Sequence, residues 1–431
     1  NSVADAVLKL FKDFNPNAKW IMQGWSPQEH IVKAIPEEDL IILDISDAYY
    51  KQSQDAVKEC FWGYPYVVGN LHNFGGRINM HGDLGLLASN QFYNAVKLGK
   101  NIVGSGLFME GLGQNPIYYD LAFEMPVHQE PVDLPAWIKD YSLRRYGAES
   151  ENAYNALMLL RENPYREGTN GVGLSSIVAA RPAVRPKKSG PNSGFKIPYD
   201  PLSLVQAQEL LLLDAAKLGT SEGYRFDIVD LQRQLMSNLG QFIHAKAADA
   251  FENGNLKEFD KHSRRFLELL ADLDQVLLTR EEYSFEERLA SAVAWAENEE
   301  EYKLYDYNAS MHVTQWGGQP EAYVLFDYAW KEWSGLTREY YLPRWEKFYA
   351  MLRECLVKGV RYDESAVPLR NGRQQLRANE FYSQLADWET EWITTPKKYG
   401  KIVHPDEIST VQAAFAKWAP VYDEYECDRI M

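Results

Sequence analysis

Short apolar runs alternate with helical spacing in the first part of the chain. The runs predict strands over residues 18–25, 40–45, 64–76 and 101–104. Apolar residues at helical spacing predict a first helix that stops at Asn15, then helices over 27–34 and 80–97. Strands that are apolar almost throughout are typical of a parallel sheet buried on both faces. The pattern fits half of a (β/α)8 barrel or a small doubly wound sheet.

The pattern becomes helical after Asp133. Helices are predicted over 135–146, 151–161, 201–217, 226–253, 256–278, 285–297, 325–357 and 370–392. Residues 163–198 interrupt them with a loop rich in Gly, Pro, Ser and basic residues. A loop of that length is either functional or disordered. The chain therefore divides into an α/β part, residues 1–130, and an all-α bundle, residues 131–431.

Polar and aromatic residues stand where each predicted strand ends. Because the carboxyl ends of parallel strands meet at one edge, these side chains are expected to converge there, where barrel active sites lie. Taken singly, each also fits a structural role, such as a loop cap for Asp44 or a bond to a carbonyl for His72. The residues are Trp25, Asp44, His72 with Asn73, and Glu110.

Glu110 occupies the most distinctive stretch, residues 104–116. Glycines surround this one carboxylate, which follows the fourth strand, and Asn115-Pro116 then opens a helical pattern. A catalytic group at the end of a barrel strand would stand in such a place. A solvated loop glutamate gives the same pattern, and most loop carboxylates are of that kind.

Composition narrows the class of partner. The net charge of −16 over 431 residues argues against nucleic acid. Aromatic residues make up 13%, which suits stacking on sugar faces or a large core equally well. The three cysteines are far apart, so neither a closed disulfide framework nor a metal motif is expected. No run of about 18 apolar residues predicts a membrane span.

Other catalytic motifs are missing from the sequence. Residues 111–116 fail the dinucleotide fingerprint at its last position, and Ser105 lacks the spacing of a nucleophile elbow. There is no HExxH motif, and His72 and His81 stand apart from carboxylate pairs. We therefore expect no metal.

Several segments together resemble the α-N-acetylglucosaminidases of glycoside hydrolase family 89, in the same order as in that family. The resemblance covers roughly residues 4–360. It is carried by Trp20–Trp25, Leu71–Gly76, Gly104–Asn115, Arg225–Gln234, Leu270–Asp274, Tyr307–Ala309, Trp316–Gly317, Phe326–Ala329, Trp333–Leu336 and Tyr340–Trp345.

The resemblance implies a (β/α)8 barrel followed by an α-helical domain that closes the pocket. It implies hydrolysis of terminal α-linked N-acetylglucosamine with retention, and Glu110 matches the family's nucleophile. The family's acid/base residue lies upstream of the strand at Trp20. Because this chain begins inside a helical pattern, we interpret it as a fragment of a longer protein.

The resemblance also implies a set of sugar-binding residues. Trp316 follows a helix, at a break where a ring can project, whereas Tyr328 lies in a helical stripe and fits the core equally well. Asp44 and His72 are further candidates for sugar contacts. The matching residues are Trp25, Leu71, Asn73 and Phe74 from the barrel, and Trp316 and Tyr328 from the helical domain.

The implied partner is a glycan with a non-reducing terminal α-N-acetylglucosamine, and no cofactor is implied. An extracellular, periplasmic or lysosome-like location follows from the resemblance, and the oligomeric state stays open.

Two alternative functions remain open. One is a catalytically incomplete glycan-binding protein of the same fold. The other is an acidic helical interaction protein in which Glu110 is incidental.

Overall fold

The structure is a computed structural model that describes most of the chain. The described residues are 2–45, 60–89, 96, 101–166, 173–191, 194–317, 326–364, 369–370, 373–374, 378–398, 400–425 and 427. Two compact units divide the chain, and we treat each by itself. The sheet unit comprises Asn1–Phe74, Gly82–Trp137 and Tyr165–Gly171. The helical unit comprises Gly75–His81, Ile138–Pro164 and Val172–Met431.

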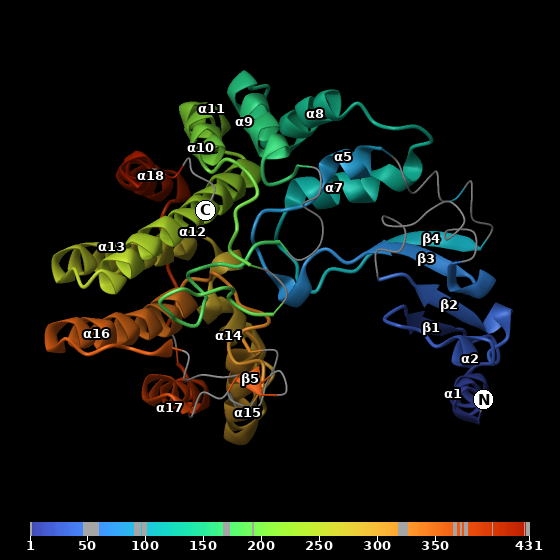
Figure 1. Cartoon of the computed structure of the whole chain (residues 1–431). Helices are drawn as coiled ribbons and strands as arrows, with labels where there is room; N and C mark the ends of the chain where they lie inside the picture. Colours follow the sequence, from blue (N-terminus) through green and yellow to red (C-terminus); the bar gives the residue numbers. More distant parts are fainter. Residues whose placement is uncertain are drawn as a thin grey trace. The chain divides into compact units, whose positions relative to one another are not determined.

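Four parallel strands form the sheet of the sheet unit, in the order β1-β2-β3-β4 (Figure 1). This order follows the chain without reversal. A doubly wound sheet reverses its strand order at a switch point, whereas barrel strands follow one another. The sheet therefore has the topology of a barrel segment. The strands are β1 (Trp20–Gln23), β2 (Leu40–Leu43), β3 (Tyr66–Asn70) and β4 (Ile102–Leu107).

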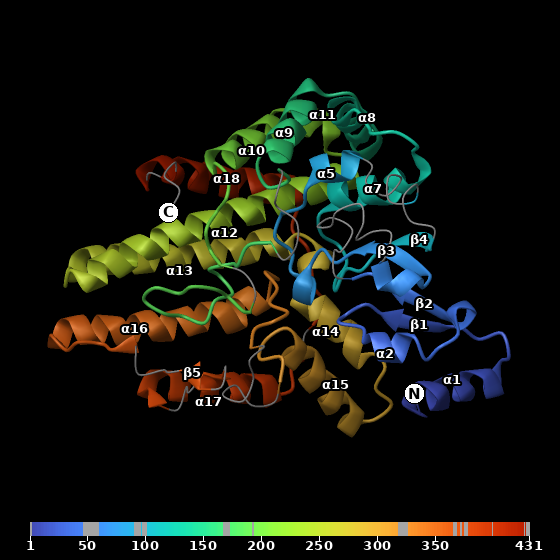
Figure 2. The same cartoon turned by 45° about the vertical axis from the view of Figure 1, so that its right-hand side comes forward.

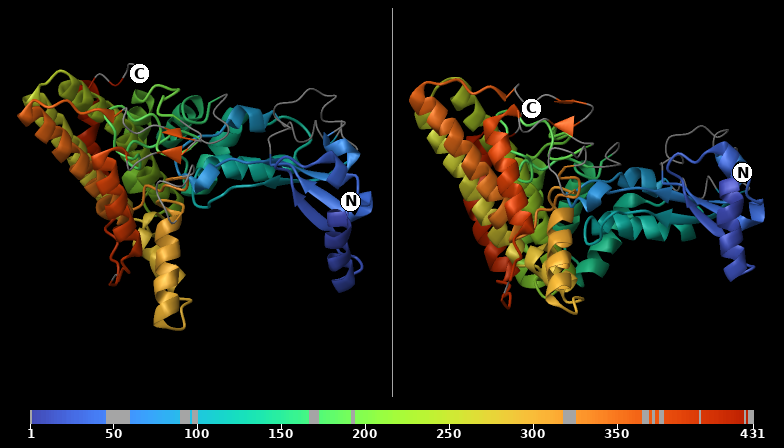
Figure 3. Two further views of the ribbon diagram at one scale, coloured as in Figure 1. Left: turned by 60° about the horizontal axis from the view of Figure 1, so that its bottom comes forward. Right: turned by 90° about the horizontal axis from the view of Figure 1, so that it is seen from below.

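The two faces of the sheet differ in burial. Helices α1 (Ser2–Phe14) and α2 (Glu29–Val32) lie beside the strands at the amino-terminal end of the chain (Figure 3). They contribute Ala4 and Val32 to a core shared with Leu40, Ile42, Tyr66 and Val68. On the other face Ile21 and Val103 remain 52% and 55% exposed. The prediction of a sheet buried on both faces is therefore wrong for this chain.

The helix predicted over 80–97 begins later than predicted, at Leu84. Helix α5 spans Leu84–Ala88, and the Asp83 side chain accepts a hydrogen bond from the Leu86 amide at its start. Gly82, at φ +134°, has a conformation that no helix contains. Val96 is helical as predicted, and residues 90–95 and 97 of the prediction lie outside the described residues. Helix α7 (Pro116–Glu124) follows β4.

Long helices dominate the helical unit. Helices α12 (Glu222–Glu252) and α13 (Leu256–Leu278) lie side by side, joined by a turn at Asn253–Asn255 (Figures 1 and 2). Helix α16 (Leu342–Lys358) packs on α13, and α18 (Glu407–Glu424) packs on α12. The others are α8 (Leu134–Tyr146), α9 (Glu151–Glu162), α10 (Leu202–Leu213), α11 (Ala215–Leu218), α14 (Phe285–Val293), α15 (Glu299–His312) and α17 (Glu380–Thr394).

Sequence periodicity missed several boundaries in this unit. The helix predicted over 325–357 begins only at Thr337, with a π-helical turn before α16, because Asp327 and Gly335 have positive φ angles. Helix α15 was not predicted, since its buried residues are the polar Asp306 and Ser310. Helix α18 was not predicted either. The single helix predicted over 370–392 includes residues of three elements. They are the paired strands β5 (Leu369–Arg370) and β6 (Arg373–Gln374), and the helix α17.

Candidate active site

Residues that follow β3 and β4 lie side by side at the carboxyl edge of the sheet. The pairing of Asn70 with Leu107 brings the two strand ends together. Glu110 comes three residues after Leu107 and is exposed, whereas His72 and Asn73 are buried. The predicted convergence at this edge is therefore confirmed for the ends of these two strands.

The buried amide of Asn73 holds the main chain around Glu110. The Glu110 N–H donates to Asn73 Oδ1 at 2.9 Å, and Asn73 Nδ2 donates to the Gly111 carbonyl at 3.0 Å. A side chain that bonds the backbone on both sides of one residue restricts the φ and ψ angles of that residue. Asn73 thus fixes the direction in which the Glu110 side chain leaves the loop.

A glycine in β3 makes room for the turn that leads to Glu110. A Cβ at Gly69 would lie 1.9 Å from the ring of Phe108 and 2.3 Å from the carbonyl oxygen of Asp44. Phe108 therefore packs directly on the Gly69 backbone. Any larger residue there would displace the chain two residues before Glu110.

A chain of polar side chains connects the loops after β3 and β4 with α7. The His72 ring lies 2.9 Å from the Tyr119 hydroxyl, which accepts a hydrogen bond from Gln114 Nε2 at 2.8 Å. Asn115 donates to Gln114 and accepts from the Tyr165 hydroxyl at 2.9 Å. Burial raises the pKa of Tyr119 well above its usual value, so its hydroxyl keeps its proton.

Asn115 also determines how the Glu110 loop ends. It has a left-handed conformation at φ +47° and precedes Pro116, the first residue of α7. Asparagine tolerates this conformation better than most residues, and proline is favoured at a helix start. Sequence reasoning gave Asn115 and Gln114 no role. The Asn-Pro pair was the signal that marked this helix start.

The other predicted residues of the sheet unit differ in exposure. Trp25 is 48% exposed, and its ring lies 6.1 Å from that of Phe74, at an interplanar angle of 58°. Asp44 and Leu71 are only 1% and 4% exposed. The His72 ring stacks on Tyr118 at 4.1 Å. Trp25 and Phe74 are thus the predicted pair of rings that this unit brings together.

Within the helical unit, Trp316 and Tyr328 lie together. Their ring centroids are 5.0 Å apart, and the centroid of the His312 ring lies 5.3 Å from that of Trp316. Trp316 lies beyond the end of α15, with φ at +63°. The prediction of a helix around Tyr328 is wrong, because residues 326–332 are irregular.

The backbone around Tyr328 is fixed by its neighbours in the helical unit. Asp327 has φ at +51°, is buried, and accepts hydrogen bonds from Arg344 at 3.1 and 3.3 Å. A Cβ at Gly75 would lie 2.3 Å from the Tyr328 carbonyl oxygen. The ring of Tyr328 is therefore held by a buried ion pair and a close backbone contact.

Two kinds of site are not found in the part of the chain that the structure describes. No group of three or more His, Cys, Asp and Glu side chains there has a geometry that could hold a metal ion. No helix there is both long and apolar enough to cross a membrane.

Comparison with known families now decides the classification. The model of the alpha-N-acetylglucosaminidase (NAGLU) C-terminal domain matches residues 137–417. The model of the NAGLU tim-barrel domain matches residues 1–129. The chain belongs to the alpha-N-acetylglucosaminidase family. The parallel sheet is thus a segment of the tim-barrel domain of this family, and the helical unit is its C-terminal domain.

Relatives within the alpha-N-acetylglucosaminidase family extend over most of this chain. The human alpha-N-acetylglucosaminidase is 29% identical, over 96% of this chain and 54% of its own length. Two structures of a family 89 glycoside hydrolase from Clostridium perfringens are each 24% identical to the chain. The complex with PUGNAc has a TM-score of 0.83, covering 96% of this chain and 46% of that protein. The complex with its substrate GlcNAc-alpha-1,4-galactose has a TM-score of 0.85, covering 98% and 47%.

These solved structures support a shared fold. The chain spans about half the length of the relatives that it matches.

Proposed function

We propose that the protein carrying this chain is a retaining exo-glycosidase that releases terminal α-linked N-acetylglucosamine, with Glu110 as the nucleophile. The observation that carries the proposal is the exposed Glu110 carboxylate after β4, whose main chain the buried Asn73 holds at 2.9 and 3.0 Å. Nucleophilic carboxylates need a fixed position because the reaction depends on alignment with the anomeric carbon.

The stereochemistry of the substrate calls for a protein nucleophile. In an α-glucosaminide the 2-acetamido group is on the same face of the ring as the leaving oxygen. It is therefore unable to attack the anomeric carbon from behind. A carboxylate on the opposite face must do so, about 5–5.5 Å from the acid in retaining enzymes.

The proposed reaction has two displacements. Glu110 forms a bond to the anomeric carbon as the glycosidic bond breaks, and a second carboxyl group protonates the leaving oxygen. Water then attacks the anomeric carbon, gives its proton to that second carboxylate and releases Glu110. In this proposal the second carboxylate lies upstream of Trp20, as the family resemblance implies.

The proposed sugar contacts include two pairs of aromatic rings. Trp25 and Phe74 supply one pair of rings, and Trp316 and Tyr328 supply another. Aromatic faces suit the apolar faces of a pyranose ring. Leu71, Asp44, His72 and Asn73 are buried, so in this proposal they shape the rim and position other groups.

The substrate class rests on the relatives. The Clostridium perfringens hydrolase is described with its substrate GlcNAc-alpha-1,4-galactose, and the human relative is an alpha-N-acetylglucosaminidase. These descriptions support a glycan with a terminal α-linked N-acetylglucosamine as the substrate here.

The test is hydrolysis of an aryl α-N-acetylglucosaminide by the full-length protein and its Glu110→Ala variant, with and without azide. We expect the variant to lose most activity and azide to restore turnover as the β-glycosyl azide. Glu37→Ala is the matched control, because Glu37 is an exposed carboxylate just before the amino end of β2. Its activity should equal that of the parent.

The outcomes separate the alternatives. Full activity of the Glu110→Ala variant would refute the assignment of the nucleophile. Binding of N-acetylglucosamine by the parent without any turnover would favour the glycan-binding alternative. Absence of both binding and turnover would favour the interaction protein.

A further inference from the structure

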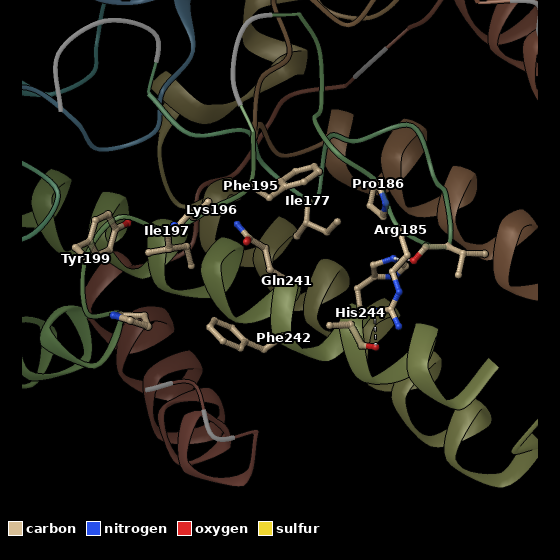
Figure 4. A pocket seen from close by; sticks show the side chains of 13 residues that line it. Ile177, Arg185, Pro186, Phe195, Lys196, Ile197, Tyr199, Gln241, Phe242 and His244 are labelled. Carbon is tan, nitrogen blue, oxygen red and sulfur yellow. Dashed lines mark hydrogen bonds between the residues drawn. The ribbon is translucent and has the colours of Figure 1, made fainter. Parts of the chain in front are cut away.

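The long loop predicted between residues 163 and 198 lines a cavity that has no part in the proposed reaction. Its described residues from 173 onward belong to the helical unit, lie against α12 and are largely buried. They enclose a cavity of about 240 Å³ against one face of that helix (Figure 4). A long loop that is ordered and buried is more often functional than incidental.

The loop is bonded at many points, so the cavity is preformed. The Ser175 N–H donates to the Gly194 carbonyl at 3.0 Å, which joins the two passes of the loop. Tyr382 on α17 donates to the Pro182 carbonyl at 2.8 Å, and Trp345 on α16 donates to the Val178 carbonyl at 3.2 Å. These bonds join the loop to itself, to α16 and to α17.

The wall of the cavity is mainly apolar. Ile177, Phe195 and Ile197 come from the loop, and Phe242 comes from α12. The cavity is larger than the roughly 150 Å³ that binds benzene in an engineered core and smaller than the about 300 Å³ where sites for drug-sized ligands begin. Its size therefore suits one ring or a short acyl chain.

Two side chains of the lining, Gln241 and Lys196, can bind a polar group. Figure 4 shows the Gln241 side chain leaving α12 toward the loop, and its amide has no hydrogen-bond partner among the residues that the structure describes. Lys196 is exposed at the border and makes no ion pair within the described ranges.

The other two basic side chains of the lining add no free positive charge near neutral pH, because one is ion-paired and the other is uncharged. Arg185 pairs with Asp249 and with Glu252, the latter at 2.7 Å. The buried His244 ring contacts the Tyr349 hydroxyl at 2.8 Å and the Val184 carbonyl at 3.2 Å, and burial lowers its pKa to about 4. Near neutral pH, Lys196 therefore contributes the one uncompensated charge of the lining.

We propose that this cavity binds a small amphipathic anion, with an apolar body of one ring or a short acyl chain and one carboxylate. The apolar body lies among Ile177, Phe195 and Phe242. The carboxylate accepts from the Gln241 amide and faces Lys196. This site belongs to the helical unit and is independent of Glu110.

Octanoate is the probe, titrated into the full-length protein by calorimetry and followed in parallel by thermal unfolding. We expect saturable binding in about the millimolar range or tighter, from the affinity that roughly ten non-hydrogen atoms supply. Neutral 1-octanol should bind more weakly, and so should butyrate, which leaves most of the cavity unfilled.

Substitutions in the lining test whether octanoate binds in this cavity. Lys196→Glu should weaken octanoate about tenfold or more, since it replaces attraction by repulsion. Ala245→Leu, which fills the cavity from α12, should abolish binding. Lys257→Glu is the matched control, an exposed lysine on α13 that makes no ion pair with described residues, and Glu110→Ala is the second control. Both should bind octanoate like the parent.

The proposal is overturned if octanoate neither binds nor raises the unfolding temperature at about ten times the expected dissociation constant. It is also overturned if Lys196→Glu and Ala245→Leu bind octanoate as the parent does, because the anion then lies elsewhere.

Discussion

Asn73 bonds to the main chain on both sides of Glu110. Its Oδ1 accepts from the Glu110 amide at 2.9 Å, and its Nδ2 donates to the Gly111 carbonyl at 3.0 Å. Asn73 follows β3 and Glu110 follows β4, so two neighbouring strands cooperate to place one carboxylate. In this arrangement Asn73 is a positioning residue, since its amide is engaged with the backbone.

Asn73→Ala should lower kcat about 10- to 100-fold with little change in KM, because a nucleophile displaced by about 1 Å loses that much rate. Two lost hydrogen bonds in a buried site should also cost about 2 kcal/mol of unfolding free energy. The measurements are steady-state kinetics and urea unfolding of the full-length protein.

Asn101→Ala provides the control for this prediction. Asn101 also bonds the backbone, donating to the Tyr64 carbonyl at 2.7 Å, but it stands at the amino end of β4. It should lose stability and keep its kcat. Equal losses of kcat in the two variants would contradict the positioning role of Asn73.

Gly69→Ala and Gly104→Ala form a second matched pair, on adjacent strands. A Cβ at Gly69 would overlap the Phe108 ring at 1.9 Å, whereas at Gly104 the nearest atom is Val67 Cγ2 at 3.9 Å. Overpacking should destabilise Gly69→Ala by about 1–3 kcal/mol and reduce activity, because Phe108 leads to Glu110. Gly104→Ala should stay within about 0.5 kcal/mol of the parent. Comparable unfolding midpoints for both variants would refute the contact argument.

The buried pair of Asp327 and Arg344 should matter far more than an exposed pair of the same geometry. Asp327→Ala leaves the Arg344 guanidinium buried without this partner, which should cost about 3–5 kcal/mol. Asp260→Ala removes the half-exposed pair with Arg353, at 2.9 and 3.1 Å, and should cost less than about 1 kcal/mol. Urea unfolding measures both. The prediction fails if the two losses are alike.

His244 should make the protein less stable as the pH falls. Burial lowers its pKa to about 4 in the folded state, against 6.5 for the ordinary value. The unfolded state therefore takes up a proton first, and stability falls as the pH drops from about 6.5 toward 4. This residue should account for about 2 kcal/mol of loss between pH 7 and pH 5. The His244→Gln variant should therefore lose about 2 kcal/mol less unfolding free energy than the parent between pH 7 and pH 5. Urea unfolding at both pH values measures the difference.

Much of the site followed from local sequence. Residues 40–45 and 101–104 were recognised as strands because apolar runs bounded by turn residues have few other uses in a globular protein. The carboxyl-end position of Glu110 followed from the strand at 101–104, and that of Asn73 followed from the strand predicted over 64–76. The matched segments then pointed to the α-N-acetylglucosaminidases, and the two family models agree with that resemblance.

Tertiary contacts decided the rest. The strand order excluded a doubly wound sheet, and no local pattern encodes which strands are neighbours. The irregular segment around Tyr328 looks helical in sequence, but its left-handed Asp327 is stabilised by Arg344, a residue 17 positions later. The two bonds between Asn73 and the Glu110 loop span 37 and 38 positions. Local sequence patterns indicated most of the strands and helices but not their boundaries, whereas long-range hydrogen bonds and burial determine which side chains meet.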